Sequence, residues 1–158
     1  MTRIRQYWLM KTEPSTFSIY DLKSSKNQIT HWEGVRNYQA RNFMRSMCKK
    51  DLVFIYHSVV DPVGIFGIGE VVKEAYPDHF QFDSESKYYD PKSKPENPIW
   101  DMVDIKLIKI FKEPILLSTL KAEKELSEML VAQKGSRLSV QPVEERHWEF
   151  ILKKLASN

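Results

Sequence analysis

The sequence has a single cysteine, Cys48, among its 158 residues, and this scarcity excludes two classes of protein. One thiol cannot provide the disulfide framework of a small secreted domain. It also cannot provide a cysteine-based zinc site, and the four histidines show neither HxxxH nor HExxH spacing. We therefore predict neither a metal site nor a cofactor.

Long hydrophobic runs are missing as well. No apolar segment approaches the roughly 20 residues that a transmembrane helix needs, and the four-residue apolar stretch near the N-terminus is not a secretory signal. We therefore expect no membrane association and a cytoplasmic location, or a nuclear one in a eukaryote. The composition, 42% hydrophobic and 28% charged residues, is that of a globular protein, and the length is most simply one domain, 1–158.

Catalytic and nucleotide-binding motifs are also absent. The glycines of GIFGIG (64–69) match neither GxxxxGK[ST] nor GxGxxG, and no helical pattern follows them. His57, Ser58 and Asp61 are the residue types of a catalytic triad. However, adjacent strand residues point to opposite faces, and no GxSxG sequence is present. We predict that the chain is not an enzyme.

Charge is unevenly distributed along the chain. Residues 1–60 carry ten Lys and Arg against four Asp and Glu, a net charge of +6. Residues 61–100 carry four against eight, a net charge of −4, and the whole chain has a formal charge of +3. A basic N-terminal third permits attraction to a polyanion, although an incidental, solvated basic surface would give the same distribution.

Hydrophobic periodicity predicts a mixture of strands and helices. The expected strands are 7–12, 52–56, 64–76, 100–111 (closed by Pro114) and 137–143, and 30–35 is irregular or a short edge strand. The expected helices are about 18–24, 38–48, 118–130 (as one helix or two) and 142–155, and 77–98 is a long loop. Glycines within a strand mark sharp coiling or close backbone approach. We expect an α+β fold with a small coiled barrel or sheet at its centre.

The stretch 30–47, THWEGVRNYQARNFMRSM, combines an aromatic ring, a glycine turn, a helix cap and several arginines. Asn37 is a good N-cap for the helix that follows. That helix would have a core stripe and a basic stripe, namely Ala40, Phe43, Met44 and Met47 against Arg41, Arg45 and Lys49. Such a segment can form one wall of a pocket for a flat ring, beside a phosphate-binding helix. The alternative is a loop and an amphipathic helix whose basic face is merely solvated.

Several aromatic residues are expected at strand ends or in loops, where their side chains can converge on a cleft. They are Trp32, Tyr38, Tyr56, Tyr88, Tyr89 and Trp100. Stacking of a nucleobase on one such ring contributes roughly 1–3 kcal/mol whatever the base. Hydroxyl and amide side chains that could select one edge of the base are Thr12, Asn37, Ser58 and Ser139. Because aromatics are also common in cores, only Trp32, with its charged neighbours, resists a pure core interpretation.

A series of longer motifs runs in order from about residue 7 to about residue 155. They are YWLMKTEP, FSIYDL, WEGVRNYQARNFMRSM, VFIYHS, GIFGIGEVVKEAYPD, YYDPKS, WDMVDI and RLSVQPV. Together they resemble the EVE domain family, with Thr12 where serine is common and Glu33 where aspartate is common. The resemblance implies a PUA-like fold, which is a compact mixed β-barrel flanked by several helices and is related to YTH, ASCH and SRA-type domains.

The resemblance also implies a reader of modified nucleic acid. The related domains hold a modified base, flipped out or single-stranded, in an aromatic-lined pocket. Members of the EVE domain family are linked to modified cytosine in DNA, and bacterial members to RNA. Carried onto matching positions, the pocket would comprise Trp32, Val35, Arg36, Asn37, Thr12, Glu13, Tyr56, His57, Ser58 and Ser139, with Trp100 and Tyr89 as further candidates. The residues expected at the flanking phosphates are Arg41, Arg45 and Lys49.

Two other classes of function stay open at this point. One is an enzyme that acts on a modified nucleotide or nucleic acid through Glu13, His57 or Ser58. The other is a module that binds a protein or a small heterocycle and leaves its arginines solvated. The sequence does not decide between DNA and RNA as the partner.

Overall fold

The computed structural model describes residues 4–156, in which six strands form one mixed sheet. In chain order they are β1 (Tyr7–Thr12), β2 (Ile29–His31), β3 (Leu52–His57), β4 (Gly64–Pro77), β5 (Asp101–Leu116) and β6 (Val140–Val143). Across the sheet the order is β2-β5-β4-β3-β1-β6. The β1–β3 pair is parallel and the other pairs are antiparallel.

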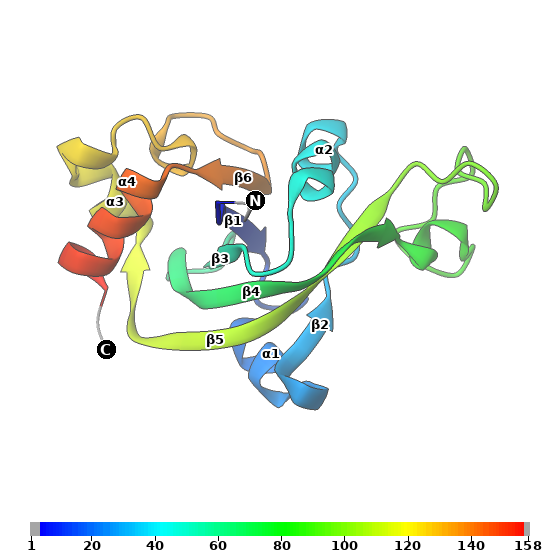
Figure 1. Cartoon of the computed structure of the whole chain (residues 1–158), viewed down its shortest axis with the longest axis horizontal. Coiled ribbons are helices and arrows are strands. Elements are labelled where there is room, and N and C mark those ends of the chain that lie inside the picture. The colour runs from blue at the N-terminus through cyan, green and yellow to red at the C-terminus, as the bar shows by residue number, and fades with distance from the viewer. Residues whose placement is uncertain (1–3, 157–158) are drawn as a thin grey trace.

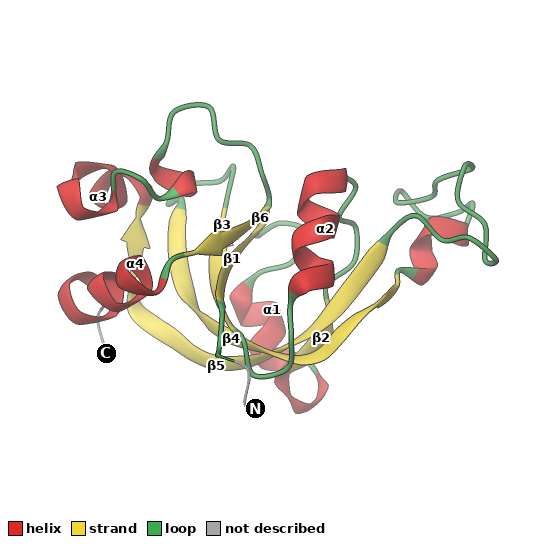
Figure 2. Ribbon diagram, turned by 45° about the horizontal axis from the view of Figure 1, so that its top comes forward, coloured by secondary structure: helices red, strands yellow, loops and turns green. Residues whose placement is uncertain are grey.

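The sheet is strongly curved, with β4 and β5 sweeping across the molecule as a long bent ribbon (Figures 1 and 2). A Cβ atom added at Gly67 on β4 would lie 2.2 Å from the carbonyl oxygen of Lys109 on β5. The prediction of close backbone approach in the glycine-containing strand is therefore confirmed. The α+β fold is confirmed too. In the described part of the chain β2 and β6 are the edges of the sheet, so closure into a barrel stays a prediction.

Four α-helices of the described chain flank this sheet. They are α1 (Ile19–Ser24), α2 (Tyr38–Ser46), α3 (Leu117–Ala122) and α4 (Glu145–Phe150), the last continued by a π-helical turn at Ile151–Leu155. Helices α3 and α4 lie at one end of the β4–β5 ribbon, and the 78–99 segment extends from the other end (Figure 1). None of the helices in residues 4–156 is long and apolar enough to cross a membrane.

Side-chain hydrogen bonds fix where α1 and α2 begin. Ser18 and Asp21 form the predicted capping box of α1, with each side chain accepting the backbone N–H of the other residue. The Asn37 side chain caps α2 by accepting the Ala40 N–H at 3.0 Å. Both helix starts therefore follow from local sequence.

Two clusters of buried hydrophobic residues lie on opposite faces of the sheet, because alternate strand residues point to opposite sides. Met10 and Ile55 belong to the cluster that contacts α1 and α2, together with Trp32. Leu9 and Phe54 belong to the cluster that contacts α3 and α4, where the Phe54 and Trp148 rings stack at 3.8 Å. A strand residue therefore contacts either the side of the sheet that carries α1 and α2 or the side that carries α3 and α4.

The predicted end of β5 at Phe111 is wrong. The strand continues through Pro114 to Leu116, where Ile115 pairs with Ile65 of β4. The β4–β5 register shifts between Ile65 and Gly67, so Pro114 lies where the ladder is interrupted and its missing N–H leaves no gap in the hydrogen bonding.

Other predicted boundaries also need correction. Helix α2 ends at Ser46 because Met47 has an extended backbone, so Lys49 lies beyond the helix and off the predicted basic stripe. The last helix does not begin at Pro142, which pairs with Trp8 in the sheet. The segment predicted as a helix over 118–130 forms α3 followed by two 3₁₀ turns. Strand β6 begins later than predicted.

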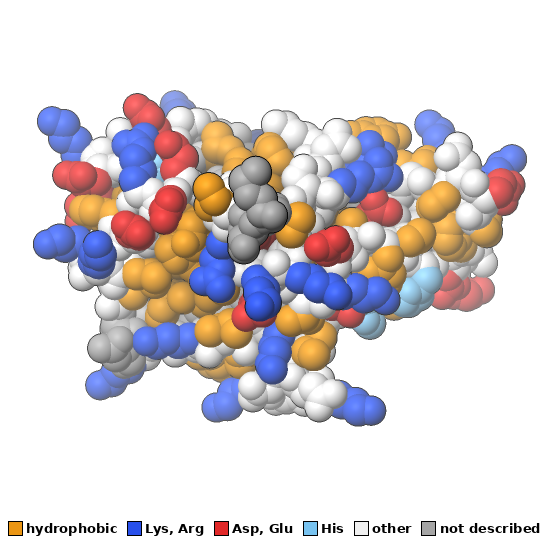
Figure 3. Space-filling model, viewed as in Figure 1, with side chains coloured by type: hydrophobic (Ala, Val, Ile, Leu, Met, Phe, Trp, Pro, Cys, Tyr) orange, Lys and Arg blue, Asp and Glu red, His pale blue; other side chains and the backbone are white. Residues whose placement is uncertain are grey.

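The basic residues do not gather into one patch on the face seen in Figure 1. Figure 3 shows Lys and Arg side chains spread over that face, with acidic side chains among them at the end that carries α3 and α4. A diffuse positive charge of this kind steers a polyanion toward the molecule without fixing where it binds.

Candidate functional site

A cavity of about 380 Å³ lies between the end of β1 and the segment that joins β2 to α2. Its volume falls in the range of about 300–1,000 Å³ that is usual for small-molecule sites. The cavity is lined by Lys11, Thr12, Glu13, Thr16, Phe17, Thr30, His31, Trp32, Glu33, Gly34, Val35, Arg36, Lys87, Tyr88 and Ser139.

Half of the predicted base-pocket residues line this cavity. They are Thr12, Glu13, Trp32, Val35, Arg36 and Ser139. Three separate chain segments supply them, and the backbone N–H of Lys11 donates to the Ser139 carbonyl at 2.8 Å, which holds Ser139 beside the end of β1. The structure therefore brings the KTEP turn, the WEGVRN segment and the start of RLSV together, as the sequence predicts.

Trp32 exposes less of its ring than a residue on which a base stacks would be expected to expose. The residue is only 8% exposed and belongs to the hydrophobic core. Its backbone N–H donates to the Val103 carbonyl at 2.7 Å, which ties the wall to β5. Trp32 thus anchors the wall and presents only part of its indole to the cavity.

Tyr56, His57 and Ser58 do not line the cavity. Tyr56 points to the opposite face of the sheet, into the cluster that contacts α3 and α4, where burial raises the pKa of its phenol. Ser58 donates its hydroxyl to the Thr12 carbonyl at 3.5 Å. Because β3 is paired with β1, with His57 beside Thr12, this strand end supports the cavity from behind.

His57 has a structural role of its own. Its Nε2 accepts the backbone N–H of Ile19 at 3.0 Å, and its ring stacks on Phe66 at 4.0 Å. The side chain is buried, and this burial lowers the pKa of His57, an effect that the nearby Asp21 carboxylate partly opposes. A neutral imidazole is needed here, because a protonated Nε2 cannot accept a hydrogen bond.

Three other predicted pocket residues lie outside the cavity. Asn37 uses its side chain to cap α2. Trp100 is buried and donates its indole N–H to Asp90 at 2.8 Å. Tyr89 is 43% exposed, and its neighbour Tyr88 lines the cavity in its place. The YYDPKS motif contains no local signal that decides between the two tyrosines.

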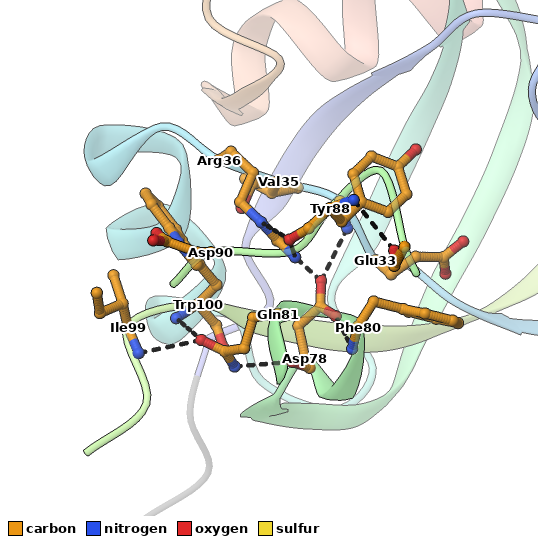
Figure 4. Close-up of polar contacts among 12 residues, drawn as sticks. Glu33, Val35, Arg36, Asp78, Phe80, Gln81, Tyr88, Asp90, Ile99 and Trp100 are labelled. Atoms are coloured by element: carbon orange, nitrogen blue, oxygen red, sulfur yellow. Dashed lines mark hydrogen bonds and ion pairs between the residues drawn. The ribbon is translucent and has the colours of Figure 1, made fainter. Parts of the chain in front are cut away.

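A buried carboxylate that the sequence analysis missed holds the cavity wall. Asp78 is 0% exposed. Its Oδ2 accepts the Gly34 N–H at 2.8 Å and Arg36 Nη1 at 2.9 Å, and its Oδ1 accepts the Phe80 N–H at 2.8 Å (Figure 4). The only sequence signal was its position in AYPD, at the end of a predicted strand.

Arg36 joins the wall to the loop that carries Tyr88. Its Nε and Nη2 donate to the Tyr88 carbonyl at 3.1 and 2.8 Å, and its guanidinium lies 5.5 Å from the Tyr88 ring (Figure 4). The Tyr88 ring in turn packs on Gly34, which has φ +86° and where a Cβ would meet the ring at 2.5 Å. A glycine is therefore required at this position.

The charged groups at the cavity are mixed in sign. His31 Nε2 lies 3.3 Å from Glu33 Oε2, and Glu13 and Lys87 add one charge of each sign to the lining. Lys11 touches the cavity, but its ammonium lies 5.6 Å from the Tyr56 ring on the other face, and burial lowers its pKa. The cavity therefore offers both donors and acceptors, which suits the polar edge of a heterocycle better than a phosphate.

The residues predicted to contact phosphate lie along α2 and beyond it, outside the cavity lining. Arg45 forms an ion pair with Asp101. Arg41 Nη1 donates to the Ile99 carbonyl at 3.0 Å, and the Lys49 N–H donates to Glu74. Their role at phosphates stays a prediction. Across residues 4–156, no cluster of three or more His, Cys, Asp and Glu side chains could hold a metal ion.

The sequence model of the EVE domain matches residues 6–154. The chain belongs to the EVE domain family. Among curated proteins, human thymocyte nuclear protein 1 is 41% identical over 168 residues, an alignment that covers 96% of this EVE domain chain and 75% of the human protein. The resemblance to the EVE domain family that the sequence motifs indicated is confirmed.

Solved structures of similar proteins superpose closely on this EVE domain. A Pseudomonas syringae protein superposes with a TM-score of 0.89 at 48% identity, covering 93% of this chain and 97% of that one. The crystal structure of human THYN1 protein in complex with 5-methylcytosine-containing DNA superposes with a TM-score of 0.90 at 42% identity, covering 94% of this chain and 96% of that one.

The Asp78 network predicts a specific weakness in this EVE domain. We expect Asp78→Asn to lower the free energy of unfolding by about 1–3 kcal/mol, because it removes the charge from a buried group that accepts three hydrogen bonds. Amide exchange at Gly34 should also accelerate. Asp83→Asn is the matched control, since Asp83 is exposed and its side chain accepts the Glu85 N–H at 2.9 Å. Equal urea midpoints and equal Gly34 exchange in the two variants would contradict the assignment.

His57 should make the stability of the EVE domain depend on pH. Since its folded-state pKa lies below the ordinary value of about 6.5, the unfolded chain binds more protons as pH falls below that value. The contribution of neutral His57 to the free energy of unfolding is therefore fully present above about pH 6.5. It is lost as the pH falls toward the folded-state pKa of His57. His147, whose pKa burial also lowers, acts in the same direction.

Urea unfolding at about pH 7.5 and about pH 5.5, on either side of the ordinary histidine pKa, measures this loss. His57→Gln keeps an acceptor for the Ile19 N–H without the titration, so its loss between the two pH values should be smaller than that of the wild type. A loss as large as in the wild type would show that His57 is not responsible.

Proposed function

We propose that this EVE domain is a non-enzymatic nucleic-acid-binding module that holds a modified base in the cavity beside Trp32. The observation that carries the proposal is the complex of human THYN1 with 5-methylcytosine-containing DNA, formed by a chain 42% identical over nearly the full length. Modified cytosine in DNA is the leading ligand, and a modified base in RNA is the alternative. Such a ligand is consistent with the cytoplasmic location, or nuclear location in a eukaryote, that we predict.

The lining of the cavity supports recognition of a base edge. Glu13 supplies a carboxylate, which is the acceptor that suits the exocyclic amine of cytosine. Thr12 and Ser139 add hydroxyl groups, and Phe17 and Val35 add apolar surface. One buried methyl group contributes about 0.8 kcal/mol, close to a fourfold change in Kd, so apolar cover alone would give modest selectivity for a methylated base.

A base can enter the cavity only after it leaves its stack. Unstacking and unpairing cost a few kcal/mol. This cost is lowest in a single strand or at a damaged or mismatched pair. The proposed module would therefore bind single-stranded or flipped bases. Mixed charge in the cavity supports placing the phosphates outside it, where Arg41, Arg45 and Lys49 are the predicted contacts.

We also propose that the chain lacks catalytic activity. Of the three residues considered for catalysis, only Glu13 lines the cavity. The Nε2 of His57 is occupied by the Ile19 N–H, and Ser58 donates its hydroxyl to the Thr12 carbonyl, so neither is placed as a base or nucleophile toward the cavity.

Fluorescence anisotropy with matched oligonucleotides tests the proposal. Single strands and duplexes, each with one 5-methylcytosine or one cytosine, are titrated with the protein at moderate salt. We expect the methylated strand to bind about fourfold more tightly, from the burial of one methyl group. We expect Trp32→Ala to weaken binding about fivefold or more, at the lower end of what a base–aromatic contact contributes.

Since Trp32 is buried, Trp32→Phe serves as a variant that retains the core packing, and it should weaken binding less. Trp148→Phe is the matched control, because Trp148 is also buried but lies in the other hydrophobic cluster. The proposal fails if neither methylation nor any Trp32 substitution changes the affinity of folded protein.

A further inference from the structure

Tyr38 is a tyrosine that the core does not use. It is the first residue of α2 and is 58% exposed, and only Asn37 separates it from the wall segment that lines the cavity. Its ring centroid lies 4.9 Å from that of the buried Trp100, with the planes inclined by 34°. The indole below therefore supports the ring in position, while the outer surface of the ring is open to solvent.

The guanidinium of Arg41 lies over the same ring. Its guanidinium carbon is 4.9 Å from the Tyr38 centroid and 6.0 Å from the Trp100 centroid. Hydrogen bonds to the Ile99 carbonyl at 3.0 Å and to Asn42 Oδ1 at 2.9 and 3.1 Å hold it there. All of these acceptors are uncharged, and no ion pair of Arg41 with a carboxylate is found in residues 4–156, whereas Arg45 is paired with Asp101. The charge of Arg41 is thus available to a ligand.

A continuous stack links this exposed ring to the cavity. The Arg36 guanidinium lies 5.5 Å from the Tyr88 ring, which lines the cavity, and 5.6 Å from the Trp100 ring (Figure 4). Trp100 then contacts Tyr38. Arg36 and the buried Trp100 therefore connect Tyr88 at the cavity to Tyr38, and Tyr38 is the exposed ring of the series on which a base of a single strand can stack.

We propose that Tyr38 and Arg41 form a second nucleotide subsite beside the cavity. The base next to the one in the cavity stacks on the open face of Tyr38, and the phosphate between the two nucleotides meets Arg41. This inference rests on the proposed function and deepens it, because it makes the ligand a strand of at least two nucleotides and not a free nucleoside or an isolated flipped base.

The test compares an oligonucleotide with the free nucleoside. We expect Tyr38→Ala to weaken binding of a short single strand with one central 5-methylcytosine about fivefold or more, the effect of losing one base–aromatic stack. Binding of 5-methyl-2′-deoxycytidine, measured by calorimetry, should be unchanged. Tyr20→Ala is the matched control, because Tyr20 is 53% exposed on α1 and is not part of the stack.

Two further measurements identify the groups involved. A strand with abasic positions on both sides of the 5-methylcytosine should bind wild type and Tyr38→Ala equally. Arg41→Gln should reduce the slope of log K against log salt by about 0.7, the value for one phosphate of a single strand. Arg146→Gln, on α4 and already paired with Glu128, should leave the slope unchanged.

The outcomes separate this inference from the proposed function. If Trp32 substitution weakens methylation-dependent binding while Tyr38→Ala and Arg41→Gln behave as wild type, the second subsite is wrong and the cavity assignment stands. If neither methylation nor any Trp32 substitution changes the affinity of folded protein, both fail.

Discussion

The carboxylate of Asp78 holds together two of the chain segments that enclose the cavity, the WEGVRN wall and the loop after β4. A carboxylate with no exposed surface is stable only where donors replace its lost water. Here the donors are the Gly34 N–H, the Arg36 guanidinium and the Phe80 N–H, all at 2.8–2.9 Å. One acceptor thus fixes the WEGVRN wall, the start of the loop after β4 and, through Arg36, the loop that carries Tyr88. The need to satisfy that charge therefore sets the position of this wall relative to the loop after β4.

This arrangement gives Arg36 a different task from the one that its sequence neighbourhood suggests. An arginine beside a tryptophan and a glycine in a basic third of a chain predicts a contact to nucleic acid. In the structure it donates to the Tyr88 and Val35 carbonyls and to Asp78, so its donors serve the protein. Its effect on the cavity is to hold Tyr88 over Gly34. The other residues that line the cavity supply hydroxyls, charged groups of both signs and apolar side chains, which suit a base edge.

Most strands and helices followed from local patterns and half of the predicted pocket from the family resemblance, whereas the remainder depends on contacts distant in sequence. Strand β1, the Asn37 cap and the Ser18–Asp21 capping box are encoded within a few residues, and all were predicted. The pairing of Asp78 with Gly34 and Arg36 spans more than forty residues and leaves no periodic signal. Tyr88 and Tyr89 are chemically alike neighbours, and only the position of Gly34 decides which ring closes the wall. Tyr56 was misplaced because its strand is covered on both faces, so no alternation of polar and apolar residues revealed its side.

The most direct test of the account is an NMR titration of the ¹⁵N-labelled protein with a short single strand that carries one 5-methylcytosine. The account predicts that the largest amide shifts occur at Thr12, Gly34, Tyr88 and Ser139, which line the cavity. An unmethylated strand should give the same shifts at higher concentration. Shifts confined to the separate groove lined by Val63, Leu116 and Lys121, with none at the cavity, would contradict it.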